Sequence, residues 1–249
     1  YYNIMKTDRS IGEKHLCISY DLKRLTILQK DQILIARPVG VGAGGGQGIR
    51  MITNNQELNK AKFELGKQYK YILASEYIKN PLLMCGYKFH LRMYWMVYPD
   101  KSGVYYSSVF PLGKIITAAD KFVCSDWHNT AIHDSHFKST TRNRYFPEDM
   151  CLLPDIITSL WNQMNNILEV AFKVIQRNAK CYEDTQYGFE VFGCDFMVTS
   201  DYLVKLLEIN ARHDYGVDDM KKANPEGFLE FCNEFYDWIY EKAICSIFC

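Results

Sequence analysis

VFGCDFMVTSDYLVKLLEIN, residues 191–210, consists of two apolar stretches separated by a short polar segment. Apolar stretches of this length, here 191–198 and 203–209, are typical of two strands joined by a tight turn. If residues 199 and 204 flank a loop of four, position 195 lies opposite position 208. The sequence therefore predicts a β-hairpin that carries two carboxylates on facing strands, with their Cβ atoms about 5 Å apart.

Asp195 and Glu208 are these carboxylates, and Asn210 follows two residues later on the same strand face. Two carboxylates at that separation repel each other unless a cation lies between them. Mg²⁺ prefers oxygen ligands, and it usually keeps few protein contacts and completes its shell with water and phosphate. The three residues are therefore candidate magnesium ligands. On spacing alone, a buried hairpin whose polar side chains pair with lysines or backbone is an equally good interpretation.

A second long strand is predicted at 87–98, where Lys88, His90 and Arg92 share one face and apolar residues occupy the other. Because Lys88 and Arg92 are four residues apart, both cations can reach one polyphosphate. For an isolated Lys-x-x-x-Arg pattern, solvated or salt-bridged charges on an exposed face are the commoner interpretation.

A glycine-rich loop at 40–48 separates short apolar stretches at 33–36 and 49–52. Glycine lets backbone N–H groups approach phosphates closely, although such loops are often only flexible turns. Helical spacing of apolar residues predicts helices at 56–70, 154–179 and 225–248, and further strands are expected at 71–78 and 104–110.

Residues 124–147 are polar and predicted to be irregular. Histidine and carboxylate side chains gather there and are ordinary zinc ligands, but their spacing matches no metal motif, so a polar surface loop is the better interpretation. These residues are Asp126, His128, His133, Asp134 and His136.

Composition excludes several classes of protein. Hydrophobic residues make up 48% of the 249-residue chain, which favours a compact fold, and 29 basic residues balance 29 acidic ones, so no global charge attracts nucleic acid or a membrane. The nine cysteines are scattered without a CxxC pair, and no stretch approaches the roughly 18 apolar residues of a membrane span. We expect a cytoplasmic protein with reduced thiols that binds neither nucleic acid nor membrane.

Three motifs, KFHLR at 88–92, GCDFM at 193–197 and LEIN at 207–210, resemble those of the tubulin tyrosine ligase-like family of ATP-grasp enzymes and follow the family's order. Residues 77–83 resemble the hinge that precedes the family's "KFDLR" strand, and the resemblance covers about 14–210. It implies an α+β ATP-grasp fold, with antiparallel sheets, flanking helices and a nucleotide held between two subdomains. The expected segments are an N-terminal part at 1–30 that upstream residues could complete, a lid subdomain at 31–80 and a C-terminal subdomain at 81–249.

The resemblance also implies roles for individual residues, with ATP and Mg²⁺ as cofactors. Magnesium would be held by Asp195, Glu208 and Asn210, and the catalytic residues would be Lys88, Arg92 and Glu208. Lys88 and Arg92 would contact phosphates, and Arg37 stands where the family usually has a phosphate-binding lysine. The remaining nucleotide contacts would come from the lid glycines and the hinge backbone at 75–78, namely Gly46, Gly48, Glu76, Tyr77 and Ile78.

The family pattern is broken on the acceptor side. His90 replaces an aspartate, Ile116 stands where an arginine is expected, and residues 211–214 replace small residues and a proline. Asn129, followed by Ile132, matches the asparagine of the family's "LTN" segment.

By this resemblance the chain is an ATP-dependent carboxylate–amine ligase that adds an amino acid to a protein or peptide carboxylate through an acyl phosphate. Its partners would be ATP, an amino-acid donor and a protein or peptide acceptor, with tubulin as the family's example. Two alternatives remain open: a nucleotide-binding pseudoenzyme that acts as an interaction or structural module, and an ATP-grasp enzyme that joins small molecules.

Overall fold

The computed structural model of the chain describes residues 2–39, 48–133, 145–178, 188–211 and 225–248. Contacts divide the chain into two compact units. The first unit comprises Tyr1–His15, His90–Ile116 and Thr141–Cys249, and the second comprises Leu16–Phe89 and Thr117–Thr140. Within the described ranges, no helix is both long and apolar enough to cross a membrane.

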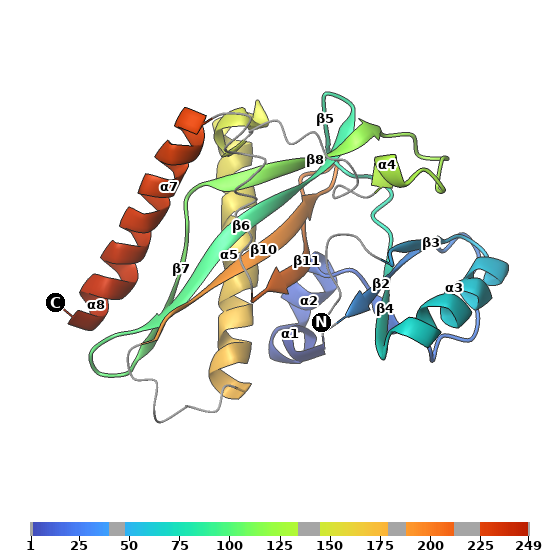
Figure 1. Cartoon of the computed structure of the whole chain (residues 1–249), viewed down its shortest axis with the longest axis horizontal. Helices are drawn as coiled ribbons and strands as arrows, with labels where there is room; N and C mark the ends of the chain where they lie inside the picture. The colour runs from blue at the N-terminus through green and yellow to red at the C-terminus, as the bar shows by residue number, and fades with distance from the viewer. Residues whose placement is uncertain (1, 40–47, 134–144, 179–187, 212–224, 249) are drawn as a thin grey trace. The chain divides into compact units, whose positions relative to one another are not determined.

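The larger sheet has seven strands and is built around β6 (Tyr87–Pro99) (Figure 1). Its main path runs β11–β10–β6–β8–β9, and β5 and β7 also pair with β6. The other strands are β5 (Leu83–Met84), β7 (Tyr105–Val109), β8 (Gly113–Lys121), β9 (Tyr145–Phe146), β10 (Glu190–Val198) and β11 (Val204–Asn210). The strand pairs β10–β11, β6–β10, β5–β6, β6–β7 and β8–β9 are antiparallel, in agreement with the fold class predicted from the sequence.

The β10–β11 hairpin confirms the predicted pairing of Asp195 with Glu208, but its turn differs from the prediction. Val198 rather than Thr199 lies opposite Val204, and the register shifts between Asp195 and Phe196. The extra residue of this β-bulge lies on β11, between the partners of 195 and 196, and it restores the expected alignment at position 195. Asp195 and Glu208, two of the predicted metal ligands, therefore face each other because of a bulge that the sequence pattern did not indicate.

Helices of the first unit cover its sheet with apolar and aromatic side chains (Figure 1). The predicted helix at 154–179 is α5 (Pro154–Asn178), which contacts β7 and β11 as well as the short helices α1 (Tyr2–Thr7) and α2 (Arg9–His15). The predicted helix at 225–248 is α7 (Pro225–Ile239), continued by a π-helical turn (Tyr240–Ile244) and α8 (Cys245–Phe248).

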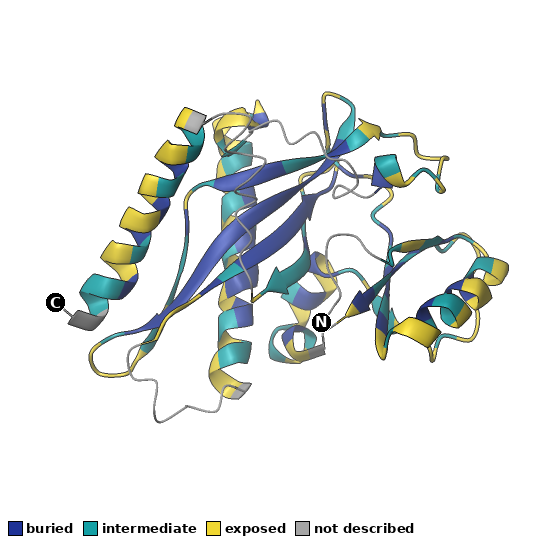
Figure 2. Ribbon diagram, in the orientation of Figure 1, coloured by how far each residue is buried: buried dark blue, intermediate teal, exposed yellow. Residues whose placement is uncertain are grey.

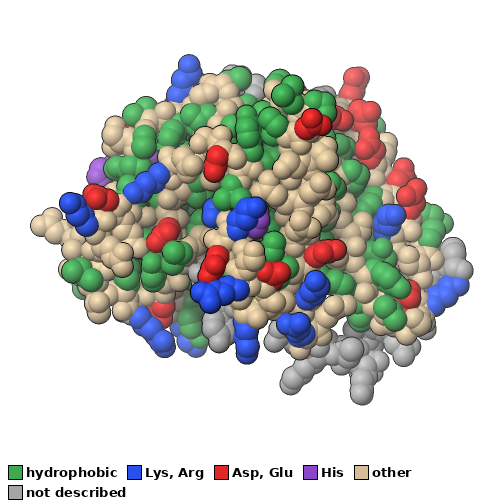
Figure 3. Space-filling view, turned by 180° about the vertical axis from the view of Figure 1, so that it is seen from behind, with side chains coloured by type: hydrophobic (Ala, Val, Ile, Leu, Met, Phe, Trp, Pro, Cys, Tyr) green, Lys and Arg blue, Asp and Glu red, His purple; other side chains and the backbone are tan. Residues whose placement is uncertain are grey.

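The inner face of α7 is aromatic, and its outer face is acidic. Phe231, Phe235 and Trp238 pack with Tyr94 and Met96 of β6 in one buried cluster. Figure 3 shows acidic side chains gathered on the α7 side of the molecule; the exposed acidic residues of this helical segment are Glu226, Glu230, Glu234, Asp237 and Glu241. This division is the ordinary pattern of an amphipathic helix on a sheet.

The cationic face of β6 is enclosed within the protein and is not exposed to solvent. Figure 2 shows β6 buried along nearly its whole length. Lys88, His90 and Arg92 are 6%, 3% and 8% exposed, so the interpretation of solvated charges on an open sheet face is wrong. Buried cations need partners, and their contacts define the candidate site.

The second unit has its own four-stranded sheet, in the order β1–β4–β2–β3. Its strands are β1 (Ser19–Asp21), β2 (Leu34–Val39), β3 (Arg50–Ile52) and β4 (Tyr71–Glu76), and its helices are α3 (Asn55–Gln68) and α4 (Thr130–His133). Asn54 caps α3 by accepting from the Glu57 backbone N–H, and the Glu57 side chain accepts from the backbone N–H and the hydroxyl of Thr53, the residue before the cap. A separate core includes Leu34, Ile52, Leu58, Leu65 and Ile72.

Several elements were not predicted. α1, α2 and β1 lie in the first 30 residues, and α4 and β9 lie in the segment that was expected to be irregular. β8 begins at Gly113, where a Cβ would collide with the Met93 sulfur and lie 3.1 Å from the Arg92 carbonyl oxygen. Glycine weakens the local strand signal, yet here it permits close strand packing, so sequence propensity missed the strand.

Candidate functional site

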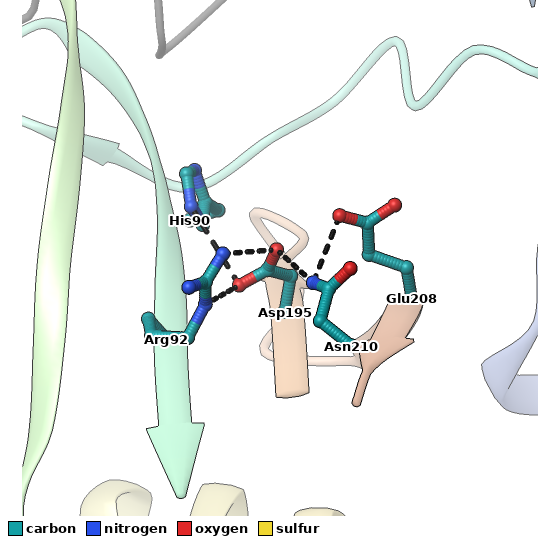
Figure 4. Close-up of polar contacts among 5 residues, drawn as sticks. All are labelled: His90, Arg92, Asp195, Glu208 and Asn210. Atoms are coloured by element: carbon teal, nitrogen blue, oxygen red, sulfur yellow. Dashed lines mark hydrogen bonds and ion pairs between the residues drawn. The ribbon is translucent and has the colours of Figure 1, made fainter. Parts of the chain in front are cut away.

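In the first unit, three neighbouring strands bring the predicted metal ligands and one predicted phosphate ligand together. Arg92 on β6 pairs with Asp195 on β10, which in turn pairs with Glu208 on β11. Residues paired across antiparallel strands share a sheet face, so these three side chains form one cross-strand row. Asn210 pairs with Gly193 in the next row of the same face (Figure 4).

Hydrogen bonds connect the row. The Arg92 guanidinium donates to both carboxylate oxygens of Asp195, with Nη2 2.9 Å from Oδ2 and Nε bonded to Oδ1. The Asn210 amide donates from Nδ2 to Glu208 Oε1 at 3.0 Å and to Asp195 Oδ2 at 3.4 Å. His90 Nε2 lies 3.9 Å from Asp195 Oδ1 (Figure 4). Repulsion between the two carboxylates is thus offset by one cation and one bridging amide.

The pairing of Arg92 with Asp195 was not predicted, because the sequence assigned these two residues to phosphate and metal respectively. Burial lowers the pKa of the Arg92 guanidinium, but the hydrogen bond and charge of Asp195 raise it by more, so the pKa lies above its ordinary value. Arg92 therefore carries a permanent positive charge inside the sheet face.

Gly193 provides space for the Arg92 side chain. A Cβ at position 193 would lie 3.2 Å from Arg92 Cδ, closer than most side-chain contacts allow, and at ordinary contact distance, 3.5 Å, from both Nε and Nη1. The sequence signal for this role was a glycine in the middle of a strand, which often marks a close approach by another group.

The donor set of this row suits magnesium. Asp195 and Glu208 supply carboxylate oxygens, and a rotation of the Asn210 amide would turn its oxygen, in place of its nitrogen, toward the carboxylates. Oxygen donors few enough to leave room for water and phosphate match what Mg²⁺ takes in nucleotide sites. The assignment of Mg²⁺ to these residues stays a prediction.

Among the described residues, no group of three or more His, Cys, Asp and Glu side chains could hold a metal. Asp126, His128 and His133 therefore form no zinc site with one another, while Asp134 and His136 lie outside the described residues. His128 is exposed and lies 3.6 Å from Glu57, as expected of a surface histidine. His133 is only 7% exposed, so the expectation of a surface residue is wrong there.

In the second unit, His133 belongs to a buried group around Lys88. The Lys88 ammonium donates to the Tyr77 hydroxyl at 3.1 Å and lies 4.4 Å from the centre of the Tyr77 ring. Tyr77 Oη is 2.8 Å from His133 Nδ1, and His133 Nε2 is 2.7 Å from the Asp126 carbonyl oxygen. Trp127 stacks on the His133 ring.

This enclosure shifts two pKa values. Burial raises the pKa of the Tyr77 hydroxyl well above its ordinary range. Burial lowers the pKa of His133, the hydrogen bond to the Asp126 carbonyl opposes that change, and the Lys88 charge lowers the pKa further. Both groups are therefore neutral near physiological pH.

The predicted hinge at 75–78 overlaps the end of β4, and two of its backbone N–H groups are already hydrogen-bonded. The Glu76 N–H donates to the Ile18 carbonyl, and the Tyr77 N–H donates to the Ile33 carbonyl. Ile78 follows Tyr77 and is half-buried. The Tyr77 side chain contacts the predicted phosphate ligand Lys88, a role that the hinge pattern does not reveal.

The remaining predicted residues are placed only in part. Arg37 lies half-buried on β2, Gly46 lies outside the described residues, and so do residues 212–214. Gly48 has a φ of +78°, a conformation that other residues rarely adopt, and a Cβ there would be too close to the Pro38 ring. These backbone and packing requirements explain the glycine without a phosphate-binding role. Asn129 accepts from the Ala131 backbone N–H at the start of α4. Phosphate binding by Arg37, Gly46 and Gly48 stays a prediction.

Comparison with known proteins agrees with the motif order. The model of the tubulin-tyrosine ligase family matches residues 26–133 and 120–224. The chain is 27% identical over 200 residues to "Probable tubulin--tyrosine ligase PBY1" of Saccharomyces cerevisiae, an alignment that covers 73% of this chain and 25% of that protein. It is 25% identical over 225 residues to human "Tubulin polyglutamylase TTLL7", covering 79% and 24% respectively. The chain thus spans about a quarter of the length of these relatives.

A solved structure has the same fold. The C-terminal domain of K. lactis Pby1, described as an ATP-grasp enzyme interacting with the mRNA decapping enzyme Dcp2, superposes with a TM-score of 0.54 at 21% identity. The match covers 91% of this chain and 69% of that chain. With its ATP-grasp fold and a family match from residue 26 to residue 224, the chain belongs to the tubulin-tyrosine ligase family.

Proposed function

We propose that this chain is an ATP-dependent ligase that adds an amino acid to a protein or peptide carboxylate through an acyl phosphate. The observation that carries the proposal is the cross-strand row of Arg92, Asp195 and Glu208, in which Arg92 and Asp195 are buried and Glu208 is half-buried, with the half-buried Asn210 beside it. Such a row offers a fixed cation and several oxygen donors on one sheet face, the combination needed to hold a metal–polyphosphate group.

In this proposal Asp195, Glu208 and Asn210 would hold Mg²⁺, which would neutralise charge on the terminal phosphates. Arg92 is oriented by Asp195, and Lys88, four residues earlier on β6, is oriented by Tyr77. Arg37 on β2 supplies a third cation. Their shared role is to position the phosphates and to offset negative charge as the phosphoryl group is transferred.

The reaction requires no protein nucleophile. An acceptor carboxylate oxygen attacks the γ-phosphorus, the bond to the ADP oxygen breaks, and ADP leaves. The amine of the donor amino acid then attacks the acyl carbon, phosphate departs with its bonding electron pair, and the amine loses a proton to form a neutral amide. The cations of the site assist the first step by stabilising the leaving ADP oxygens.

A protein or peptide acceptor is proposed by analogy with the relatives, whose names describe ligation of tyrosine or glutamate to tubulin. Tubulin is therefore the first acceptor to test, in a cytoplasmic setting. His90 and Ile116 depart from the family pattern on the acceptor side, so other protein and peptide carboxylates belong in the same assay.

Glu208→Gln tests the proposal directly, because it removes one metal-binding charge and keeps the side-chain volume. We expect ATP-dependent amino-acid incorporation to fall by about 10²-fold or more, with the fold unchanged by circular dichroism. Glu190→Gln is the matched control, since Glu190 lies exposed on β10 and should leave turnover unchanged. Full turnover in the Glu208 variant would exclude the proposed role.

A nucleotide-binding module without ligase activity is the second candidate function. It is favoured by His90, which is buried 3.9 Å from Asp195 at a position where the family pattern has an aspartate. On this hypothesis the chain binds Mg²⁺–ATP but releases no ADP with any combination of amino acid and acceptor. Calorimetric ATP binding together with a coupled ADP assay distinguishes the two functions.

A further inference from the structure

A directed chain of hydrogen bonds runs through the second unit, from Lys88 through Tyr77 and His133 to the backbone carbonyl of Asp126. The carbonyl oxygen can only accept, so His133 Nε2 must carry a hydrogen and donate it. In a neutral imidazole the other ring nitrogen, Nδ1, then accepts from the Tyr77 hydroxyl. The Tyr77 oxygen is consequently left to accept from the Lys88 ammonium, and each donor in the chain has one acceptor.

Lys88 has particular need of such a partner. Its side chain is long and flexible, yet it is 6% exposed, and a buried ammonium is costly unless it is hydrogen-bonded. Tyr77 provides both a hydroxyl oxygen at 3.1 Å and a ring face 4.4 Å from the ammonium. The His133 backbone carbonyl lies 3.5 Å from the same nitrogen. Two residues, Tyr77 and His133, thus contribute three contacts to one cation.

We propose that His133 is a positioning residue for Lys88: its neutral imidazole accepts the Tyr77 hydroxyl hydrogen and thereby directs the Tyr77 oxygen toward the ammonium. The inference rests on the proposed function, because the placement of Lys88 matters to ligation only if Lys88 contacts the nucleotide phosphates. It extends that function by assigning a role to a histidine that is far from the metal ligands in sequence.

Protonation of His133 breaks the chain at its centre. A hydrogen on Nδ1 would donate to Tyr77 Oη, so the Tyr77 hydroxyl could no longer donate to His133. A second positive charge would also appear next to Lys88. The charged and titratable groups next to His133 are Lys88 on β6, Tyr77 after β4 and Asp126 before α4, and Cys124 acts on Tyr77. Phe122 and Trp127 contact the ring and carry no charge.

Asp126 exerts the opposite influence, since its charge raises the pKa of His133. Burial and Lys88 outweigh it, and the pKa lies below the ordinary value of 6.5. His133 is therefore neutral at pH 7 and becomes protonated only as the pH falls below 6.5, the ordinary pKa value of the group. The inference predicts that affinity for ATP falls on the acid side, while affinity for adenosine, which lacks phosphates, does not.

The experiment compares ATP and adenosine binding by calorimetry at about pH 7.5 and about pH 5.5. His133→Leu should weaken ATP binding about threefold to tenfold, as expected for one lost hydrogen bond, without changing adenosine binding. His133→Gln can still accept from Tyr77 but cannot be protonated, so it should restore affinity at neutral pH and remove the acid-side loss. His128→Gln, in the same segment but exposed, is the matched control.

Tyr77→Phe provides a second route to the same result. It keeps the aromatic ring over Lys88 and removes only the hydroxyl, so it should reproduce the ATP-specific loss of His133→Leu. Unchanged ATP affinity in both variants would overturn the inference. Equal losses for ATP and adenosine would also overturn it, because they would indicate a merely structural role.

A measurement without nucleotide separates this inference from the proposed function. If the unaltered chain fails to bind ATP, the proposed function is wrong, while the ¹⁵N chemical shifts of His133 still test the hydrogen-bond chain. We expect the neutral Nε2–H tautomer at pH 7, and its replacement by the charged form at a pH below 6.5. A neutral Nδ1–H tautomer, or a charged ring at pH 7, would contradict the positioning role.

Discussion

At the scale of single residues, the site depends on Arg92 and Asp195. The planar guanidinium matches the carboxylate with two parallel hydrogen bonds, a geometry that lysine cannot reproduce. Both residues are buried, so each provides the charge that makes burial of the other tolerable. In the absence of a metal, Arg92 is the cation that the Asp195 carboxylate requires.

Removal of one partner should therefore cost much more than removal of a surface pair. We predict that Arg92→Ala lowers the free energy of unfolding by about 3–5 kcal/mol, measured by urea denaturation, because it leaves Asp195 buried without its counter-charge. Arg9→Ala, which disrupts the exposed Arg9–Glu13 pair, should leave the free energy of unfolding nearly unchanged, because solvent screens that pair. In a double-mutant cycle with Asp195→Ala, additive losses would contradict the pairing.

Residue-level prediction from the sequence succeeded where a short-range rule applied. The two-residue period of strands and a tight turn predicted that Asp195 lies opposite Glu208, and the structure confirms this pairing, although it does so through a different turn and a β-bulge on β11 that offset each other. Arg92 is about a hundred residues from Asp195 in the chain, and no local pattern states which strands are neighbours in a sheet. For the same reason, the contact between Tyr77 and His133 was invisible until the fold was known.

At the scale of elements, β6 serves two purposes on one face. Its first half carries Lys88, His90 and Arg92, and its second half carries Tyr94 and further residues of the aromatic cluster under α7. Alternation predicted which residues share a face, but it could not predict that both faces are buried. Burial of the cationic half depends on the partner strands, which lie far away in the sequence.

The close approach of β10 to the Arg92 side chain yields a prediction for Gly193. Gly193→Ala should lower the free energy of unfolding by about 1–2 kcal/mol, because the new methyl group would lie 3.2 Å from Arg92 Cδ and must displace it. The matched control is Gly188→Ala, where no atom lies within 4 Å and the change should be close to neutral. Equal stability of the two variants would contradict the prediction that a methyl group at position 193 displaces the Arg92 side chain.

α2 protects the edge strand β11 through a buried histidine. His15 Nδ1 donates to the Val204 carbonyl at 2.8 Å, and Lys205 donates to the Lys14 carbonyl at 2.6 Å. Burial lowers the pKa of His15, the Val204 hydrogen bond opposes that change, and the charges of Lys14 and Lys205 lower the pKa further. The folded chain therefore binds a proton at His15 less readily than the unfolded chain.

This difference predicts how stability depends on pH. Because the unfolded state binds more protons, the contribution of His15 is fully present above pH 6.5 and is lost as the pH falls below that value. His15→Asn keeps a donor in the Nδ1 position but does not titrate. Urea midpoints measured between about pH 7.5 and about pH 5 should fall less steeply in this variant than in the unaltered chain. Parallel pH profiles would contradict the role of His15.

At the scale of the whole molecule, sequence patterns predicted the long helices and most strands because each of them buries a periodic apolar face. Both units have their own apolar core, in agreement with that reasoning. α1 and α2 were missed because they are short and are stabilised by contacts with distant elements, and β8 was missed because it begins at a glycine that weakens the local strand signal. The ATP-grasp fold itself followed from the order of the motifs and not from periodicity.

The central claim is that Asp195, Glu208 and Asn210 hold the magnesium ion of Mg²⁺–ATP. The most direct measurement is a crystal structure of the chain with magnesium and a nonhydrolysable ATP analogue. We predict a metal ion about 2.1 Å from oxygen atoms of all three side chains, with the Asn210 amide turned to present its oxygen. A bound nucleotide whose magnesium contacts none of these three residues would contradict the claim.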